Sequence, residues 1–341
     1  MGRHVESSVK FGITLLPSPA SEYIDWCQTA EAAGFDMIGI ADSQSLYREV
    51  FVGTTLCALN TERVRFGPLV INPMTRHPAV AASAIATVAE LAPGRAILGI
   101  GTGDSAVHNA GVDPADLAEL RAYTTAIQDL QSKGIAEYHG RQVKLTWEGP
   151  RVPIYVAASG PKTLELAGEI ADGVIILTGL LPEVIEDSII RVRTGAEKSG
   201  RSLDDLDLWW FHWSAVADTR DAAIDMIKMS LASGAKHLAR FTTIGKHIPG
   251  DLEPKIREVK RRYRFDQHQQ PGSDNVRLIE ELGLVDYLAD RMAIAGTPQE
   301  CIAKIESAAE AGARQFCMHV GFDDKTGFMR AWSAQVMSAF K

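Results

Sequence analysis

The chain has 341 residues, 46% of them hydrophobic, and a formal net charge of −8 at pH 7. The acidic balance argues against nucleic acid or an anionic membrane surface as a partner, and no apolar run approaches the roughly 18 residues of a membrane span. The four cysteines are far apart without CxxC spacing, so we expect buried thiols rather than a zinc site or disulfides. The first twelve residues lack the apolar core of a signal peptide, which favours a cytoplasmic protein.

Short apolar runs recur eight times along the chain, and each is followed by a helix-like stretch. Strands that alternate with helical patterns pair in parallel through crossovers, and eight such units close into a (β/α)8 TIM barrel. In that fold the chemistry lies at the carboxyl ends of the strands. The predicted strands cover residues 11–16, 37–41, 64–71, 96–101, 154–158, 174–177, 206–216 and 316–320.

Proline, glycine and capping residues mark the helices between these strands. Residues 137–147 read as a surface hairpin. Between strands seven and eight the alternation of strand and helix patterns stops, and residues 235–291 predict a helical insertion. We therefore expect residues 1–341 to form one barrel domain that includes this insertion. The predicted helices cover residues 21–33, 50–59, 78–91, 114–133, 161–170, 182–199, 218–233 and 298–311.

Small residues follow the fifth and sixth strands. The fifth ends in Ala158, Ser159 and Gly160 directly before a proline, where backbone N–H groups at a helix start can bind a phosphate. Thr178 and Gly179 close the sixth strand. The alternative is a helix capped by Ser159 followed by an ordinary tight turn.

The fourth strand runs into Gly101, Thr102, Gly103 and Asp104. Alternating glycines would let a flat ring lie close to the strand end. A carboxylate at Asp104 could then exchange a proton with a substrate. The alternative is that Asp104 only caps the next helix.

Polar residues also follow the second and third strands. Asn72 offers an amide to the edge of a heterocycle, and His77 lies near the same rim. Asp42 closes the second strand. We take Asp42 and His77 as further catalytic candidates, although a turn aspartate and a structural histidine explain the same pattern. The aromatic seventh strand places His212 or its neighbours in the barrel interior.

Three segments together resemble the bacterial luciferase-like superfamily of flavin and deazaflavin oxidoreductases. Within it, the chain is most similar to the methylenetetrahydromethanopterin reductase-like branch, whose members commonly use coenzyme F420. The segments are NPMTRHPAVAASAIATVAELAPGRAILGIGTGDSA, AASGPKTLELAGEIADGVIILTG and GTPQECIAKIESAAEAGARQF.

The resemblance implies roles for several of these residues. Ser159 and Gly160 would bind the cofactor phosphate, and Asn72 with the 101–103 strand end would hold the ring system. Asp104 matches a glutamate proposed as proton donor in F420-dependent sugar-phosphate dehydrogenases. The family also has a non-prolyl cis peptide on strand three, and the matching bond here is Leu69–Val70.

One departure from that pattern bears on the substrate. The sugar-phosphate dehydrogenases carry a histidine directly after the second-strand aspartate and a tryptophan nearby, where this chain has Ser43 and Tyr47. This argues against sugar-phosphate oxidation. We therefore predict an F420-dependent oxidoreductase that moves a hydride between the cofactor and a small organic substrate. It would work as a homo-oligomer, either a dimer or a tetramer. The alternatives are an FMN-dependent monooxygenase and a flavin-binding protein without turnover.

Overall fold

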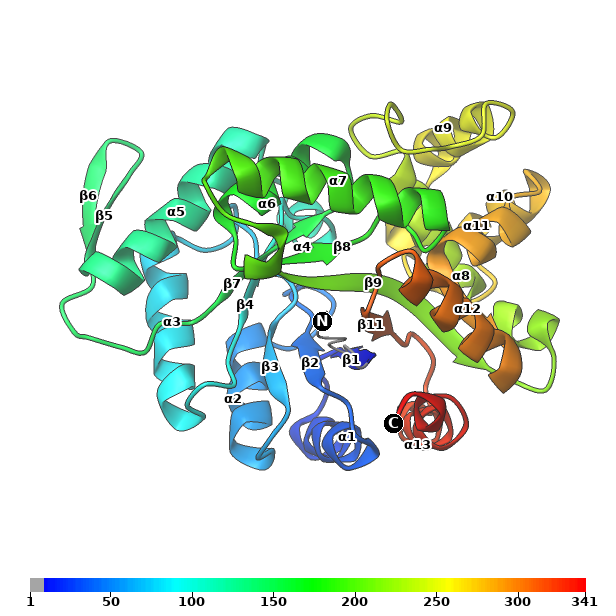
Figure 1. Ribbon diagram of the computed structural model, residues 1–341, viewed down its shortest axis with the longest axis horizontal. Helices are drawn as coiled ribbons and strands as arrows, with labels where there is room; N and C mark the ends of the chain where they lie inside the picture. The colour runs from blue at the N-terminus through cyan, green and yellow to red at the C-terminus, as the bar shows by residue number, and fades with distance from the viewer. Residues whose placement is uncertain (1–8) are drawn as a thin grey trace, which may run out of the picture. The chain divides into compact units, whose positions relative to one another are not determined.

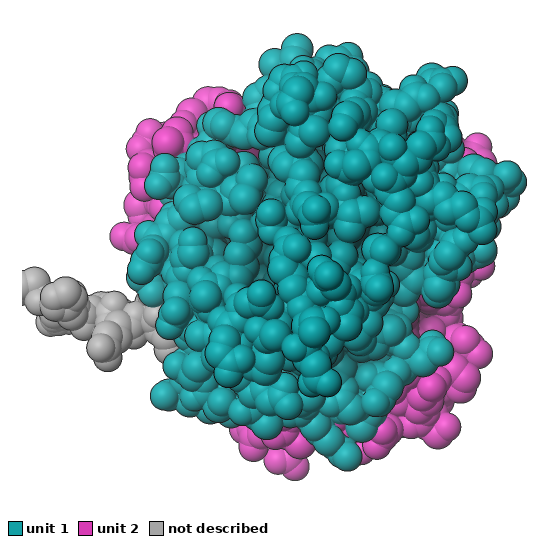
Figure 2. All heavy atoms as spheres, turned by 90° about the vertical axis from the view of Figure 1, so that its right-hand side faces the viewer, with its two compact units in different colours: residues 1–12, 177–189, 208–341 teal, residues 13–176, 190–207 magenta. Residues whose placement is uncertain are grey.

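A computed structural model describes residues 9–341, which form two compact units. Unit 1 holds the described part of residues 1–12 together with residues 177–189 and 208–341, and unit 2 holds residues 13–176 and 190–207 (Figure 2). The first eight residues of the segment read above as lacking a signal peptide lie outside the described part. No described helix is long and apolar enough to cross a bilayer.

Strands and helices alternate along most of unit 2, with two successive helices, α4 and α5, and the hairpin β5–β6 between β4 and β7 (Figure 1). β2 pairs in parallel with β3, β4 with β7, and β7 with β8, while bridges at Phe66–Ala96 and Ile71–Ile100 join β3 to β4. The bounds are β1 (Lys10–Leu15), α1 (Ala20–Ala33), β2 (Met37–Ile40), α2 (Val50–Asn60), β3 (Arg65–Pro68), α3 (Pro78–Leu91), β4 (Leu98–Ile100), α4 (Ser105–Asn109), α5 (Leu117–Lys133), β5 (Ile135–Tyr138), β6 (Arg141–Lys144), β7 (Ile154–Ala158), α6 (Pro161–Ile170) and β8 (Gly173–Ile176).

Local sequence explains where several of these elements begin and end. Pro78 starts α3, because a proline at the first helical position lacks only an N–H that would have no helical partner. Asp116 caps α5 by accepting a hydrogen bond of 2.8 Å from the Glu119 N–H, so α5 begins three residues after the predicted start. Gly34, in the left-handed conformation, ends α1. The predicted hairpin is confirmed as the antiparallel pair β5–β6.

In unit 1 the long strand β9 has two parallel neighbours. Its first half pairs with β11 and its second half with β10. The sequence did not predict β10, whose four residues come just after the predicted insertion. α8 also runs five residues past its predicted end, to Leu238. α7 (Pro182–Lys198) belongs to unit 1 up to residue 189 and to unit 2 beyond it. The other bounds are β9 (Asp207–Val216), α8 (Arg220–Leu238), α9 (Glu253–Arg262), α10 (Asp274–Glu281), α11 (Val285–Met292), β10 (Ala293–Gly296), α12 (Pro298–Glu310), β11 (Gln315–His319) and α13 (Lys325–Gln335).

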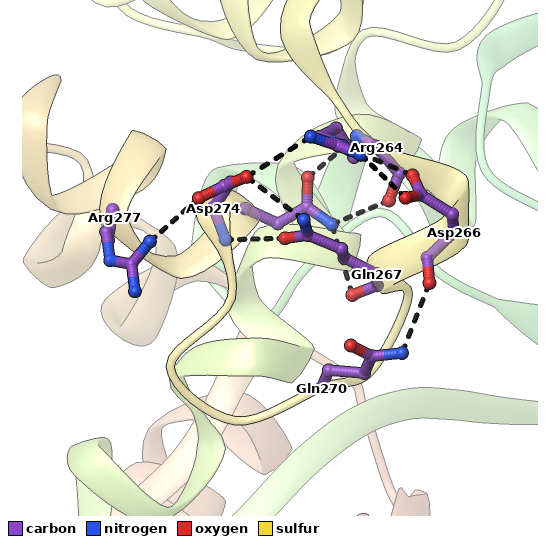
Figure 3. Close-up of polar contacts among 7 residues, drawn as sticks. Arg264, Asp266, Gln267, Gln270, Asp274 and Arg277 are labelled. Atoms are coloured by element: carbon purple, nitrogen blue, oxygen red, sulfur yellow. Dashed lines mark hydrogen bonds and ion pairs between the residues drawn. The ribbon is translucent and has the colours of Figure 1, made fainter.

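A polar brace closes the connection between α9 and α10 (Figure 3). The backbone N–H of Arg264 donates to Asn275 Oδ1, and Asn275 Nδ2 donates back to the Arg264 carbonyl, each at 2.8 Å. Asp274 exchanges two hydrogen bonds with Gln267 and accepts an ion pair from Arg277. The two ends of this loop are therefore bonded to each other.

Hydrophobic residues hold the helices of this region together. Side chains of α8 pack with those of α9, α10 and α11 in one buried cluster, which includes Leu231, Ile256, Ile279 and Leu288. The parallel sheet has the strand order β3-β2-β1-β11-β9-β8-β7-β4. With helices between its strands, this is the predicted TIM-barrel fold.

Candidate active site

The predicted site residues of unit 2 come from the carboxyl ends of neighbouring parallel strands. The Gly101 N–H donates to the Ile71 carbonyl at 2.9 Å, which ties the end of β4 to the end of β3. Ser105 Oγ lies 3.0 Å from Ser43 Oγ, which ties the start of α4 to the loop after β2. The structure therefore brings together the segments that follow β2, β3 and β4, as the sequence predicted.

The Leu69–Val70 peptide bond directly after β3 is cis, as the resemblance led us to expect. Glycines on both neighbouring strands make room for these two side chains. A Cβ at Gly39 or Gly99 would lie 2.5 Å from a methyl group of Leu69, and one at Gly101 would lie 2.8 Å from Val70 Cγ2. The bulge is therefore a packing reason for glycine at positions 99 and 101. The predicted slot for a flat ring at the end of this strand stays a prediction.

Asn72 shapes the turn that follows this bulge. Its side chain is buried, and Oδ1 accepts hydrogen bonds from the N–H groups of Met74 at 3.0 Å and Thr75 at 3.1 Å. Among the described residues its Nδ2 has no acceptor. The amide is therefore held in place by its oxygen and has a donor left for a ligand.

Asp42 forms a buried ion pair. The Arg76 guanidinium bonds both carboxylate oxygens of Asp42 and reaches Glu49 at 2.8 Å, while its face lies over the Phe51 ring. The Asp42 side chain is only 1% exposed. Burial raises its pKa above the ordinary value, and the Arg76 charge opposes that shift without cancelling it. The sequence predicted Asp42 as a catalytic candidate and did not indicate that Arg76 would hold it; a catalytic role for Asp42 stays a prediction.

Asp104 stands at the N-cap position of α4, but its side chain makes no capping hydrogen bond. Its backbone is irregular, with φ −139° and ψ −103°. Gly103 before it has a φ of +88°, a conformation that favours glycine. The simple capping explanation for Asp104 is therefore not what this structure shows.

His77 has a structural role, which was the alternative to a catalytic one in the sequence analysis. It is the N-cap of α3, and its Nδ1 accepts a hydrogen bond of 3.2 Å from the Ala79 N–H. Its ring is exposed and meets the Tyr138 ring edge-on at 5.4 Å. The geometry gives His77 a capping function, and a catalytic role for it stays a prediction.

The segment after β7 differs in detail from the sequence reading. Gly160, with extended backbone, is the N-cap of α6, and no side chain caps the helix, so Ser159 does not have the expected capping role. Pro161 occupies the first helical position. Within the described part of the chain, no side chain accepts from the N–H groups of the first turn of this helix, which suits an anionic ligand.

Thr178 and Gly179 belong to unit 1, where a buried arginine surrounds them. Thr178 Oγ1 shares a hydrogen bond of 2.9 Å with Ser188, and its carbonyl accepts one of 3.0 Å from Arg291 Nε. Gly179 has a φ of +120°. Sequence reasoning missed Arg291, because an arginine 112 positions from Gly179 gives no local signal beyond its apolar neighbours.

The sequence predicted His212 or its neighbours in the barrel interior, and the structure shows that His212 is buried. It is fully buried in β9, and its Nδ1 lies 3.0 Å from Ser214 Oγ. Burial lowers its pKa to about 4, so the ring is neutral at neutral pH. Its Nε2 has no hydrogen-bond partner among the described residues. All four cysteines are free and buried, as expected.

Comparison with known proteins places this chain in a family. The chain is 30% identical to a 5,10-methylenetetrahydromethanopterin reductase of Methanolobus tindarius over 89% of its length and 92% of that protein. It is 28% identical to an F420-dependent glucose-6-phosphate dehydrogenase of Nakamurella multipartita, over 93% and 91% respectively.

A solved structure has the same fold. It is the coenzyme F420-dependent tetrahydromethanopterin reductase of Methanopyrus kandleri, with a TM-score of 0.78 and 27% identity, covering 98% of this chain and all of that one. Residues 4–315 match the family described as luciferase-like monooxygenase. This chain is therefore a member of the luciferase-like family.

Proposed function

We propose that this chain is a cytoplasmic oxidoreductase that uses coenzyme F420 to transfer a hydride to or from a small organic substrate. One observation carries the proposal: full-length relatives with two different reactions, a reductase and a dehydrogenase, are both F420-dependent. The four free, buried cysteines suit a reducing compartment.

The residues at the strand ends fit such a cofactor. The uncapped start of α6, with Ala158, Ser159 and Gly160 before it, would bind the phosphate through backbone N–H groups. In unit 1, Thr178 and Gly179 would contribute a second cofactor-binding turn.

The ring system would be held by the segments after β3 and β4. The Nδ2 donor of Asn72 and the backbone of Gly101, Thr102 and Gly103 would bind it, next to the Leu69–Val70 bulge. When bound, the deazaflavin supplies the hydride chemistry, and the protein supplies binding, orientation and proton management.

We assign the proton to Asp104. It lies four residues after the end of β4, and its side chain makes no capping hydrogen bond to α4. A carboxylate there can give or take the proton that accompanies hydride movement at the substrate oxygen or nitrogen. Asp42 is held by Arg76, and we propose that it fixes the loop after β2 against the site.

The substrate is best sought outside the sugar phosphates. Ser43 is buried and is bonded to Ser105, and it stands where the sugar-phosphate enzymes have a histidine. Small hydroxyl groups at this position leave space and offer no cation to a phosphate. We therefore propose a small uncharged carbonyl, alcohol or imine-type substrate.

Cofactor titration tests the proposal. Quenching of F420 fluorescence should give saturable binding to the apoprotein, and FMN should bind much more weakly. Gly160→Val should weaken F420 binding about tenfold or more, because the added side chain blocks close approach to the first turn of α6. Gly250→Val is the matched control, since a Cβ at Gly250 would meet open space.

Each outcome of the titration has a defined meaning. Tight binding of FMN with no binding of F420 would replace the proposal by an FMN-dependent monooxygenase. Binding of either cofactor without turnover over a broad set of carbonyl and alcohol substrates would favour a flavin-binding protein. Equal F420 affinity of a folded Gly160→Val variant would remove the phosphate assignment.

We also propose that the chain forms a homodimer through α2 and α3. The two helices pack against each other, and together they contain one charged residue, Glu90. Val52, Leu59 and Val80 on them are each about three-fifths exposed. Because every copy carries a charge of −8, an uncharged face is where two copies can meet without like-charge contacts.

The dimer is tested by light scattering after size-exclusion chromatography. Leu59→Glu should convert a dimer into a monomer, whereas Ile190→Glu, on an exposed apolar residue of α7, should not. A wild-type monomer at micromolar concentration, or a dimer that Leu59→Glu leaves intact, would contradict this assignment.

A further inference from the structure

Arg291, in the last turn of α11, is an unusual buried cation. The residue is 0% exposed, and its guanidinium contacts no carboxylate among the described residues. All of its hydrogen bonds go to three backbone carbonyls and the Tyr287 hydroxyl. Burial lowers its pKa from the ordinary value, with Tyr287 opposing that shift. Burying a charged group without a charged partner costs free energy, so a buried arginine in these surroundings indicates a specific structural role.

Arg291 holds the turn after β8 through both its side chain and its main chain. Nε donates to the Thr178 carbonyl at 3.0 Å, and the Arg291 carbonyl accepts a hydrogen bond of 2.6 Å from the Leu180 N–H. A Cβ at Gly179 would lie 2.7 Å from both Cγ and the carbonyl oxygen of Arg291. The side chain and the main chain of Arg291 thus contact this turn from two directions. Gly179 within the turn has a φ of +120°, which favours glycine.

The other end of the guanidinium is fixed to a second segment. Nη1 donates to the His247 carbonyl at 2.9 Å and Nη2 to the Lys246 carbonyl at 2.6 Å. Lys246 is itself buried, and its ammonium donates to the carbonyls of His237, Leu238 and Arg240 at the end of α8. A chain of hydrogen bonds therefore runs from α8 through Lys246 and Arg291 to the turn after β8.

We infer that Arg291 is a positioning residue for the cofactor, acting by fixing the turn of Thr178, Gly179 and Leu180 without contacting the cofactor itself. This inference rests on the proposed function, in which that turn binds the cofactor. The planar guanidinium holds three carbonyls from two separate segments, Thr178 on one side and Lys246 and His247 on the other. A lysine ammonium concentrates its charge on one nitrogen and cannot reproduce that planar geometry. Arg291→Lys therefore keeps the positive charge and loses the hydrogen bonds that hold the two segments.

Arg95 offers a matched control elsewhere in the chain. Its guanidinium also binds only neutral oxygens, namely the carbonyls of Ala58, Thr61 and Val64 and the Thr61 hydroxyl. It precedes β4 and so lies toward the amino ends of the strands, away from the site residues of its own unit. Arg95→Lys should cost comparable thermal stability and leave cofactor affinity unchanged.

The experiment compares Arg291→Lys and Arg95→Lys in two measurements. F420 titration should show affinity weakened about tenfold or more in Arg291→Lys only, since small displacements at a binding site have effects of this size. Hydrogen exchange of the apoprotein should be faster around residues 178–181 in Arg291→Lys only. If Arg291→Lys does not fold, Tyr287→Phe removes one bond to Nη1 and should show the same changes to a smaller degree.

The outcomes separate the inference from the proposed function. Wild-type protein that binds no F420 would refute the proposed function, and exchange at 178–181 would still report whether Arg291 holds the turn. Wild-type protein that binds F420, with an Arg291→Lys variant of equal affinity, would overturn the inference alone. An equal loss of affinity in Arg95→Lys would also overturn it, because the effect would then follow from stability.

Discussion

The neutral histidine inside β9 predicts a specific loss of stability in acid. His212 is fully buried, and the Phe316 ring meets it edge-on at 6.0 Å. Burial lowers its pKa from 6.5 to about 4. The folded state therefore disfavours the protonated ring, while the unfolded chain takes up the proton at its ordinary pKa.

The direction and size follow from the two pKa values. Above pH 6.5 both states are neutral and His212 has no effect on the pH dependence. As the pH falls from 6.5 toward 4, only the unfolded state binds the proton, so the free energy of unfolding decreases. The full shift corresponds to about 3.4 kcal/mol, and about 2.6 kcal/mol of it is lost by pH 4.5. Below pH 4 both states are protonated and the loss no longer grows.

The test is His212→Phe, followed by urea unfolding of the apoprotein between pH 7.5 and pH 4.5. Phenylalanine fills the same space, and the missing Nε2 costs little because that atom has no partner among the described residues. Loss of the Ser214 partner lowers stability equally at every pH. The variant should lose less stability in acid than wild type, by about 2.6 kcal/mol. His108→Phe, on an exposed residue of α4, should match wild type. Parallel pH profiles for wild type and His212→Phe would refute the reasoning.

Three further predictions concern Asp104, Glu31 and Gly173. Asp104→Asn should bind the cofactor almost normally and lose turnover by roughly 10²-fold or more; single-turnover rates near those of wild type would leave Asp104 structural. Glu31 is partly buried, yet hydrogen bonds from three consecutive N–H groups outweigh that burial and lower its pKa. The ionised Glu31 carboxylate therefore stabilises the folded state at pH values above its ordinary pKa, and this stabilisation is lost as the pH falls through the lowered pKa of the folded state. Glu31→Gln should lower the free energy of unfolding at pH 7, and its stability should then change less with pH in acid, as measured by urea unfolding. Gly173→Ala should destabilise by about 1–3 kcal/mol, because the added methyl would overlap the Tyr155 ring; an unchanged melting temperature would show that the ring can move aside.

The strand pattern was predictable because parallel strands that are buried on both faces are short apolar runs. All eight predicted runs contain or overlap a strand of the sheet, and proline or glycine marks several helix ends. β10 was not predictable in this way. Its four residues, Ala293–Gly296, follow a helix directly and offer no alternation, and only pairing with the second half of β9 makes them a strand.

The candidate site was predictable where it depends on strand ends and unpredictable where it depends on distant partners. Asp42, Asn72 and Asp104 follow strands, and parallel strands place their carboxyl ends at one edge. The close contact between Arg291 and Gly179 depends on packing between segments that are far apart in the sequence. Gly101 was interpreted from its own strand, whereas the side chain that a Cβ there would meet is Val70, which follows the neighbouring strand β3.

The brace between α9 and α10 bears on how this chain can change over evolution. Arg264 and Asn275 bond to each other at the two ends of the loop, so the shape of its base does not depend on the residues at its tip (Figure 3). Closing a longer loop on the same base costs little extra, because the entropy of closure grows only with the logarithm of length. Insertions near Pro271 and Gly272 should therefore be tolerated without displacing either helix. Sequence length can drift at this point while the barrel keeps its geometry.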